Sequence, residues 1–199
     1  MRDHRLDVLI GTQVIAKGHH FPDLTLVGVV DGDLGLSGGD LRTAERQFQL
    51  LYQVGGRAGR ASRPGRVLIQ THLPEHPVMQ ALAAGDKERF YAEELVERRA
   101  AGLPPFGRLA ALIVVGRDPT ETRRFAAALA RDAPDLPGLR VLGPAPAPLA
   151  LLRGRHRQRL LVIAASDIDL PEGLRPWLKG LRVPGSIRLQ IDMDPYGFL

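Results

Sequence analysis

The 199-residue sequence contains no cysteine. Without thiols, neither a disulfide framework nor a thiolate zinc site can stabilise this chain. Long hydrophobic runs are also absent, because the longest, such as residues 109–115, fall well short of the roughly 20 residues that a membrane-spanning helix needs. The charged start of the sequence leads into no signal-peptide core. These absences predict a cytoplasmic protein that makes no membrane contact.

The sequence also has no Gly-x-x-x-x-Gly-Lys-Ser/Thr phosphate loop and no Asp-Glu box. Motors that hydrolyse nucleoside triphosphates use the loop to hold phosphates and acidic residues to hold magnesium. We therefore expect the chain by itself to be inactive as an ATP hydrolase. Lysine is scarce, since 24 of the 27 basic residues are arginine. Genome composition also produces such a bias, so only local clusters of arginine carry information.

The positive charge of the chain lies in its second half. The formal net charge is +5. Residues 1–105 hold 13 basic and 13 acidic side chains, whereas residues 106–199 hold 14 basic and 9 acidic ones. A basic half beside a neutral half indicates an anionic partner for the basic half. Nucleic acid and an acidic peptide tail are the two classes of partner that we expect.

Apolar patterning in the first half predicts alternating strands and helices. Residues 6–11 and 24–30 are short apolar runs typical of buried strands in a parallel sheet. Residues 40–60 have apolar positions at helical spacing, and residues 66–71 form another strand-like run. This strand, helix, strand order belongs to an α/β layer fold.

Two predicted helices and a proline pair separate the halves. Residues 77–84 and 86–102 show helical patterning. On the second of these helices, the charged residues that we expect to face solvent are Glu93, Glu94, Glu97, Arg98 and Arg99. Pro104 and Pro105 then end the helix, because consecutive prolines cannot continue one. This predicts a domain boundary, with domains over residues 1–105 and 106–199.

The second half begins a new pattern. In chain order it predicts a strand, a helix, two strands, a helix and a strand, over residues 109–115, 119–131, 140–142, 158–164, 170–181 and 186–193. A loop rich in proline and alanine separates the second and third of these strands. The β-α-β-β-α-β order is the signature of an α+β ferredoxin-like sandwich, with helices on one face of an antiparallel sheet.

The segment Gln53-Val54-Gly55-Gly56-Arg57-Ala58-Gly59-Arg60 places two arginines three positions apart among glycines. On a helix, positions i and i+3 share a face, so both guanidinium groups can point toward one ligand. Each group offers a planar fork of donors that matches phosphate oxygens. The segment is typical of a nucleotide-phosphate site, and the alternative is an ordinary arginine-rich surface.

A polar loop with Thr12, Gln13 and Lys17 follows the first predicted strand. Backbone amides and short polar side chains can hold phosphates at the carboxyl edge of an α/β sheet, although an ordinary turn has the same composition. The adjacent His19 and His20 do not complete a metal site, because no cysteine or Asp-His spacing supplies further ligands. We expect no metal ion in this chain.

The densest charge cluster spans residues 153–159. Its arginines occupy alternate positions, at Arg153, Arg155, Arg157 and Arg159. On one extended strand they would all lie on one side, about 7 Å apart. Such a row can follow a phosphate backbone or receive an acidic peptide. The alternative is an edge strand that its charge protects from aggregation.

Several segments together resemble a known family. They are residues 11–23, Ala44-Glu45-Arg46, residues 53–60, Leu103-Pro104-Pro105-Phe106, Leu142-Gly143-Pro144 and Asp192-Met193-Asp194-Pro195. Over essentially the whole chain, the sequence resembles the primosomal protein N′ (PriA) family of replication-restart helicases in superfamily 2. Residues 11–23 and 53–60 resemble motifs V and VI of the second RecA-like lobe.

This resemblance implies a partial RecA-like helicase lobe, with a parallel sheet, followed by a DNA-binding or partner-binding domain. The residues that it implies for DNA binding are Thr12, Gln13 and Lys17. For nucleotide binding they are Gly18, His20 and Gln53, and for catalysis Arg57 and Arg60. The charge pattern adds the row of Arg153, Arg155, Arg157 and Arg159 to the expected DNA-binding residues. His20 departs from the superfamily pattern, because many helicases have an acidic residue at this position.

The implied parent enzyme is an ATP-dependent DNA helicase. It would hydrolyse ATP with magnesium, carry a zinc module whose cysteines this chain lacks, and restart replication at stalled or branched forks. The expected partners are branched and single-stranded DNA, the single-stranded-DNA-binding protein and other primosome proteins. Two alternatives remain: a non-enzymatic nucleic-acid or protein-binding module, and a related translocase that acts on another nucleic acid, such as RNA.

Overall fold

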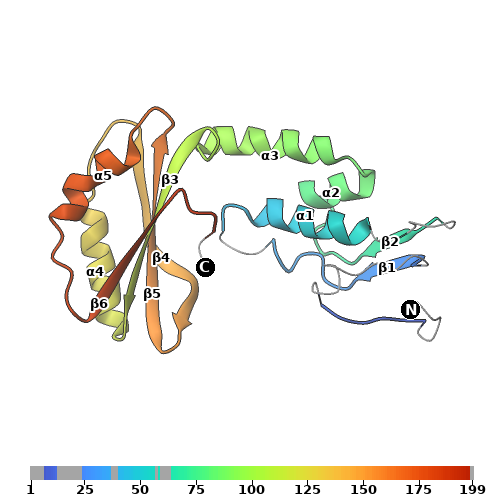
Figure 1. Cartoon of the computed structure of the whole chain (residues 1–199), viewed down its shortest axis with the longest axis horizontal. Helices are drawn as coiled ribbons and strands as arrows, with labels where there is room; N and C mark the ends of the chain where they lie inside the picture. The colour runs from blue at the N-terminus through green and yellow to red at the C-terminus, as the bar shows by residue number, and fades with distance from the viewer. Residues whose placement is uncertain (1–6, 13–23, 37–39, 57, 59–63, 198–199) are drawn as a thin grey trace. The chain divides into compact units, whose positions relative to one another are not determined.

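The computed structural model describes residues 7–12, 24–36, 40–56, 58 and 64–197. The chain divides into two compact units, residues 1–93 and 94–199, and the dividing point falls inside helix α3, Lys87–Ala101 (Figure 1). The domain boundary predicted from the proline pair lies further along the chain, after residue 105, and stays a prediction.

Unit 1 contains the predicted strand, helix, strand order. Strand β1, Leu26–Val29, pairs in parallel with β2, Arg66–Ile69, and helix α1, Thr43–Gly55, connects them. Helix α2, Pro77–Ala84, has the bounds that we predicted. Its ends explain why: His76 caps the start by accepting a hydrogen bond from the Val78 N–H at 3.2 Å, and Gly85 ends it with a positive φ of 65°.

Aromatic stacking holds the helices of unit 1 together. Phe48 of α1 and Phe90 of α3 lie parallel, with ring centroids 4.1 Å apart and planes 7° apart. Val78 and Ala81 of α2 complete this buried cluster. The apolar positions at helical spacing in α1 therefore form a core, as the sequence pattern predicts.

Two expectations for the strands of unit 1 were wrong. Residues 7–11 form no strand, and Val8 and Ile10 are 72% and 90% exposed. A short apolar run becomes a strand only when a neighbour takes up its backbone hydrogen bonds, and no described segment pairs with this one. Strands β1 and β2 are mostly exposed rather than buried, because their sheet has only two strands in the described residues.

Unit 2 has the predicted order of six elements. These are β3 (Gly107–Gly116), α4 (Pro119–Arg131), β4 (Leu139–Leu152), β5 (Arg155–Ala165), α5 (Leu170–Lys179) and β6 (Ile187–Met193). All neighbouring strands are antiparallel, in the spatial order β4-β5-β3-β6. Figure 1 shows α4 and α5 along the same face of this sheet.

The helices of unit 2 begin where side chains cap them. The carboxylate of Asp118 accepts a hydrogen bond from the Glu121 N–H at 2.7 Å, and that of Asp169 accepts one from the Glu172 N–H at 3.0 Å. Between the helices and the sheet lies a core that includes Leu112, Leu129, Leu160, Leu170, Leu174 and Trp177. Helix α4 again has the predicted bounds.

Strand β4 is longer than predicted. We expected a strand over residues 140–142 and then a loop rich in proline, whereas the strand continues to Leu152 with register shifts after Leu142 and Pro146. The prolines fit because β4 is an edge strand, where a missing N–H leaves no ladder bond unmade. Gly143 allows the first irregularity, with a φ of 104° and a neighbouring Arg159 carbonyl 2.7 Å from where a Cβ would lie.

Candidate functional site

The sheet of unit 2 has one face against α4 and α5 and a second face that carries arginines. Leu112, Val114 and Leu160 belong to the core on the helix side. Since side chains alternate along a strand, odd-numbered positions of β3 and β5 point to the other face. Val115 pairs with Arg157 on one side and Arg188 on the other, so all three side chains share that face.

We call Arg155, Arg157, Arg159 and Arg188 the arginine face. The centre of this surface is apolar, because Ile113 and Val115 of β3 are buried between the flanking strands. Arg155 and Arg188 are exposed and make no ion pair with described residues. Two such exposed arginines, Arg155 and Arg188, beside a small apolar centre give a surface suited to an anionic partner.

The arginine row is not the single straight strand that alternation predicts. Arg153 and Gly154 form a two-residue turn, with φ values of 50° and 70°, and Leu152 pairs with Arg155 across it. Two positive φ values are typical of the tight turn that joins antiparallel strands. Arg153 therefore lies at the tip of the β4–β5 hairpin, and only the later arginines lie along β5.

Arg157 is almost fully buried, with 6% of the residue exposed. Its Nη1 donates a hydrogen bond to the Pro148 carbonyl of the irregular part of β4, at 3.0 Å. The sequence row predicted four equivalent charges, and the structure instead contains exposed arginines beside a recessed one. Sequence spacing does not reveal this difference, because the burial of Arg157 depends on the irregular part of β4 that lies beside β5.

Most site residues predicted for unit 1 fall outside the described residues. These are Gln13, Lys17, Gly18, His20, Arg57 and Arg60. Thr12 is described and exposed, and so is Gln53 in the last turn of α1. We expected a helix through residue 60, but α1 ends at Gly55 and Gly56 forms its C-cap. The shared helical face expected for Arg57 and Arg60 lies outside the described residues and stays a prediction.

Asp33 is a polar centre that the sequence analysis missed. Its carboxylate accepts a hydrogen bond from the Thr71 hydroxyl and another from the His72 N–H at 2.6 Å, and these bonds hold the pKa of Asp33 below its usual value. Gln47 of α1 donates to the neighbouring Gly32 carbonyl at 2.6 Å. The signal was a polar residue shortly after each strand, Asp33 after β1 ends at Val29 and Thr71 after β2 ends at Ile69, since parallel strands end at the same edge.

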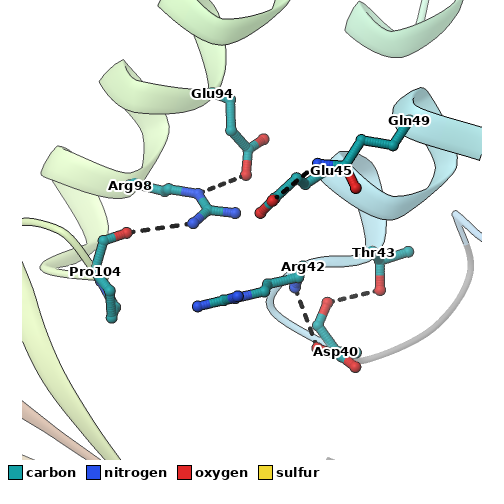
Figure 2. Close-up of polar contacts among 8 residues, drawn as sticks. All are labelled: Asp40, Arg42, Thr43, Glu45, Gln49, Glu94, Arg98 and Pro104. Atoms are coloured by element: carbon teal, nitrogen blue, oxygen red, sulfur yellow. Dashed lines mark hydrogen bonds and ion pairs between the residues drawn. The ribbon is translucent and has the colours of Figure 1, made fainter. Parts of the chain in front are cut away.

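Figure 2 shows polar contacts near the end of α3 and at the start of α1. In α3, Arg98 donates through Nε to Glu94 at 2.7 Å and through Nη1 to the Pro104 carbonyl at 3.3 Å. Both side chains of this ion pair are only 14% exposed. The expectation that Glu94 and Arg98 face solvent was therefore wrong. At the start of α1, the Asp40 carbonyl accepts a hydrogen bond from the Thr43 hydroxyl at 2.6 Å, and the helix begins at Thr43 rather than at the predicted residue 40.

Two kinds of feature are absent from the described residues. There, no three His, Asp or Glu side chains are close enough together to hold a metal ion. No described helix combines the length and apolar character required to cross a bilayer.

The comparison with known families identifies the class of unit 2. Residues 99–196 match the family described as "Primosomal protein N C-terminal domain". This stretch begins in the last turns of α3 and includes the whole four-stranded sheet with its two helices. The arginine face therefore belongs to a primosomal-protein C-terminal domain.

The whole chain is similar to proteins named "Replication restart protein PriA". It is 43% identical to the one from Rickettsia felis over 198 residues, which cover 100% of this chain and 30% of that protein. It is 40% identical to the Haemophilus influenzae protein over 94% of this chain and 26% of that protein. It is 36% identical to the Bacillus subtilis protein over 96% of this chain and 24% of that protein. The chain belongs to the PriA family and corresponds to the C-terminal portion of these proteins.

Proposed function

We propose that this chain supplies the C-terminal part of an ATP-dependent DNA helicase that restarts replication at stalled or branched forks. The observation that carries the proposal is similarity over the full chain to proteins named for replication restart. The chain spans less than a third of the length of the Rickettsia felis relative. In this proposal, the phosphate loop, the magnesium ligands and the zinc module belong to the rest of the parent enzyme.

In this proposal, residues 1–105 belong to the second RecA-like motor lobe. The parallel pairing of β1 with β2 through α1 supports this assignment, because such lobes are built from strand, helix, strand units. Arg57 and Arg60 would neutralise charge on the transferred phosphate, and Gly18, His20 and Gln53 would contact the nucleotide. Thr12, Gln13 and Lys17 would contact the DNA backbone.

Residues 106–199 form the nucleic-acid-binding domain in this proposal, with the ferredoxin-like arrangement. The β-α-β-β-α-β order and one-sided helices support the fold. The exposed positive charge of Arg153, Arg155 and Arg188 supports binding of branched and single-stranded DNA. The single-stranded-DNA-binding protein and other primosome proteins are the protein partners that we propose for the parent enzyme.

The test measures binding of the purified chain to labelled single-stranded DNA, forked DNA and RNA of equal length. Fluorescence anisotropy at several salt concentrations gives the affinity and its salt dependence. We expect DNA binding that weakens as salt rises. Absence of DNA binding at low salt would contradict the assignment of residues 106–199, and clear preference for RNA would favour the alternative translocase.

A further inference from the structure

Arg157 differs from the other arginines of the arginine face because its side chain is buried. Only 6% of the residue is exposed, although Arg155 is exposed two positions earlier on the same strand. Arg157 makes one hydrogen bond, to the Pro148 carbonyl, and no ion pair with a described carboxylate. Burying a charge is costly, and proteins normally pair a buried charge with an opposite one. We therefore expect a bound ligand to supply the negative charge that pairs with Arg157.

The remaining donors of Arg157 reach solvent. Within the described part of the chain, Trp177 Nε1 is the one buried side-chain nitrogen or oxygen without a hydrogen-bond partner. Nε and Nη2 of Arg157 also have no protein partner, so they are not sealed inside the protein. These two nitrogens form one edge of the guanidinium group. Their N–H bonds are parallel, which matches two oxygens of one carboxylate or phosphate.

In Arg108, the same Nε and Nη2 edge of the guanidinium group binds a carboxylate of this chain. Its Nε donates to both carboxylate oxygens of Asp194 at 3.1 Å, and its Nη2 donates to one of them at 2.6 Å. Arg108 thus has a protein carboxylate on the edge that Arg157 leaves open. The comparison indicates an oxyanion with two available oxygens as the missing partner of Arg157.

We infer that the Nε and Nη2 edge of Arg157 is a two-point site for one backbone phosphate of a nucleic acid. This inference rests on the proposed DNA binding of residues 106–199. The surrounding charges favour a polyanion, because Arg155 lies on the same face of β5 and Arg188 lies across β3, and both are exposed. Exposed arginines attract the backbone without fixed geometry, whereas the recessed Arg157 holds one phosphate in a defined orientation.

The experiment compares three Arg→Lys variants of the whole chain in binding to a labelled single-stranded oligonucleotide. Arg157→Lys keeps the charge but loses the fork, so its affinity should fall roughly tenfold, with an unchanged salt slope. Arg155→Lys makes the same exchange at an exposed position and should change affinity by less than about twofold. Arg182→Lys, in the exposed segment after α5, is the control, because it measures the effect of an Arg→Lys exchange outside the arginine face. Melting temperatures establish that each variant is folded.

A second measurement uses the unsubstituted chain, so it does not depend on the folding of Arg157→Lys. The side-chain Nε–H resonance of Arg157 is followed by ¹⁵N NMR during titration with the oligonucleotide, inorganic phosphate or an acidic peptide. We expect the oligonucleotide to shift this resonance, and phosphate to shift it at higher concentration.

The outcomes separate this inference from the proposed function. If the chain binds DNA while the Arg157 resonance stays unmoved and Arg157→Lys binds normally, the phosphate site is wrong and DNA binding stands. If the chain binds no DNA, the proposed function of residues 106–199 fails. A shift produced by the acidic peptide and not by the oligonucleotide would overturn the inference in favour of a protein partner.

Discussion

Replacing both Arg155 and Arg188 with alanine should weaken DNA binding and reduce its dependence on salt. Both side chains are exposed and make no ion pair with described residues, so their loss should leave the fold intact. Each arginine that neutralises a phosphate of single-stranded DNA contributes about 0.7 to the slope of log affinity against log salt. Removing two such contacts should lower the slope by about 1.4.

The size of this change makes it measurable. Between about 50 and 200 mM salt, a slope difference of about 1.4 changes the ratio of wild-type to variant affinity by about sevenfold. Fluorescence anisotropy with a labelled oligonucleotide measures both affinities at each salt concentration. The double variant should lose most affinity at low salt and approach the wild type as salt rises.

The matched control is the double replacement of Arg123 and Arg124 with alanine. These exposed arginines lie on α4, on the helix side of the sheet, and their loss lowers the net charge of the chain by the same amount. The control should bind with nearly the wild-type slope. If the two double variants lower the slope equally, net charge alone governs binding, and the arginine face has no special part in it.

Three further predictions follow from the structure. Gly107→Ala should lower the melting temperature by at least about 4 °C, because its Cβ would collide with the backbone carbonyls of Gly102 and Ala164, and overpacking costs about 1–3 kcal/mol; an unchanged melting temperature would contradict the packing. Asp194→Asn should destabilise the protein at about pH 7, and the destabilisation should shrink as the pH falls through the folded pKa of Asp194. The hydrogen bond from Arg108 lowers the pKa of Asp194, so its contribution is present above the unfolded pKa and lost as pH falls through the folded pKa; a melting difference that persists in acid would refute this. The purified chain should show no ATP hydrolysis above background, and turnover that Arg57→Ala abolishes would refute that expectation.

Local sequence signals predicted the helices of this protein well. Helices α2 and α4 have the predicted bounds because Pro77 and Pro119 begin them directly after capping residues. The order of elements in residues 107–193 was also predicted, since the apolar residues of each element recur at the spacing typical of a helix or a strand. These signals depend only on residues close together in the sequence, so they can be recognised without knowing the three-dimensional structure.

The features that depend on distant segments were not predicted. Proline normally argues against a strand, so the second half of β4 was expected to be a loop until its edge position was known. Burial of Arg157 depends on that same irregular strand, which supplies the Pro148 carbonyl. Asp33 and Thr71 meet only because β1 and β2 end at one sheet edge. In each case the deciding neighbour is far away in the sequence.

The most direct test of the proposed function measures DNA-stimulated ATP hydrolysis in a complete enzyme that contains this chain. Arg57→Ala and Arg57→Lys are compared with the wild type at saturating DNA and ATP, alongside DNA affinity and melting temperature. If Arg57 contacts the transferred phosphate, we expect hydrolysis to fall about 10³-fold in Arg57→Ala, with poor rescue by lysine and nearly unchanged DNA binding and melting. Near-normal hydrolysis in Arg57→Ala would contradict the assignment of this chain to the motor.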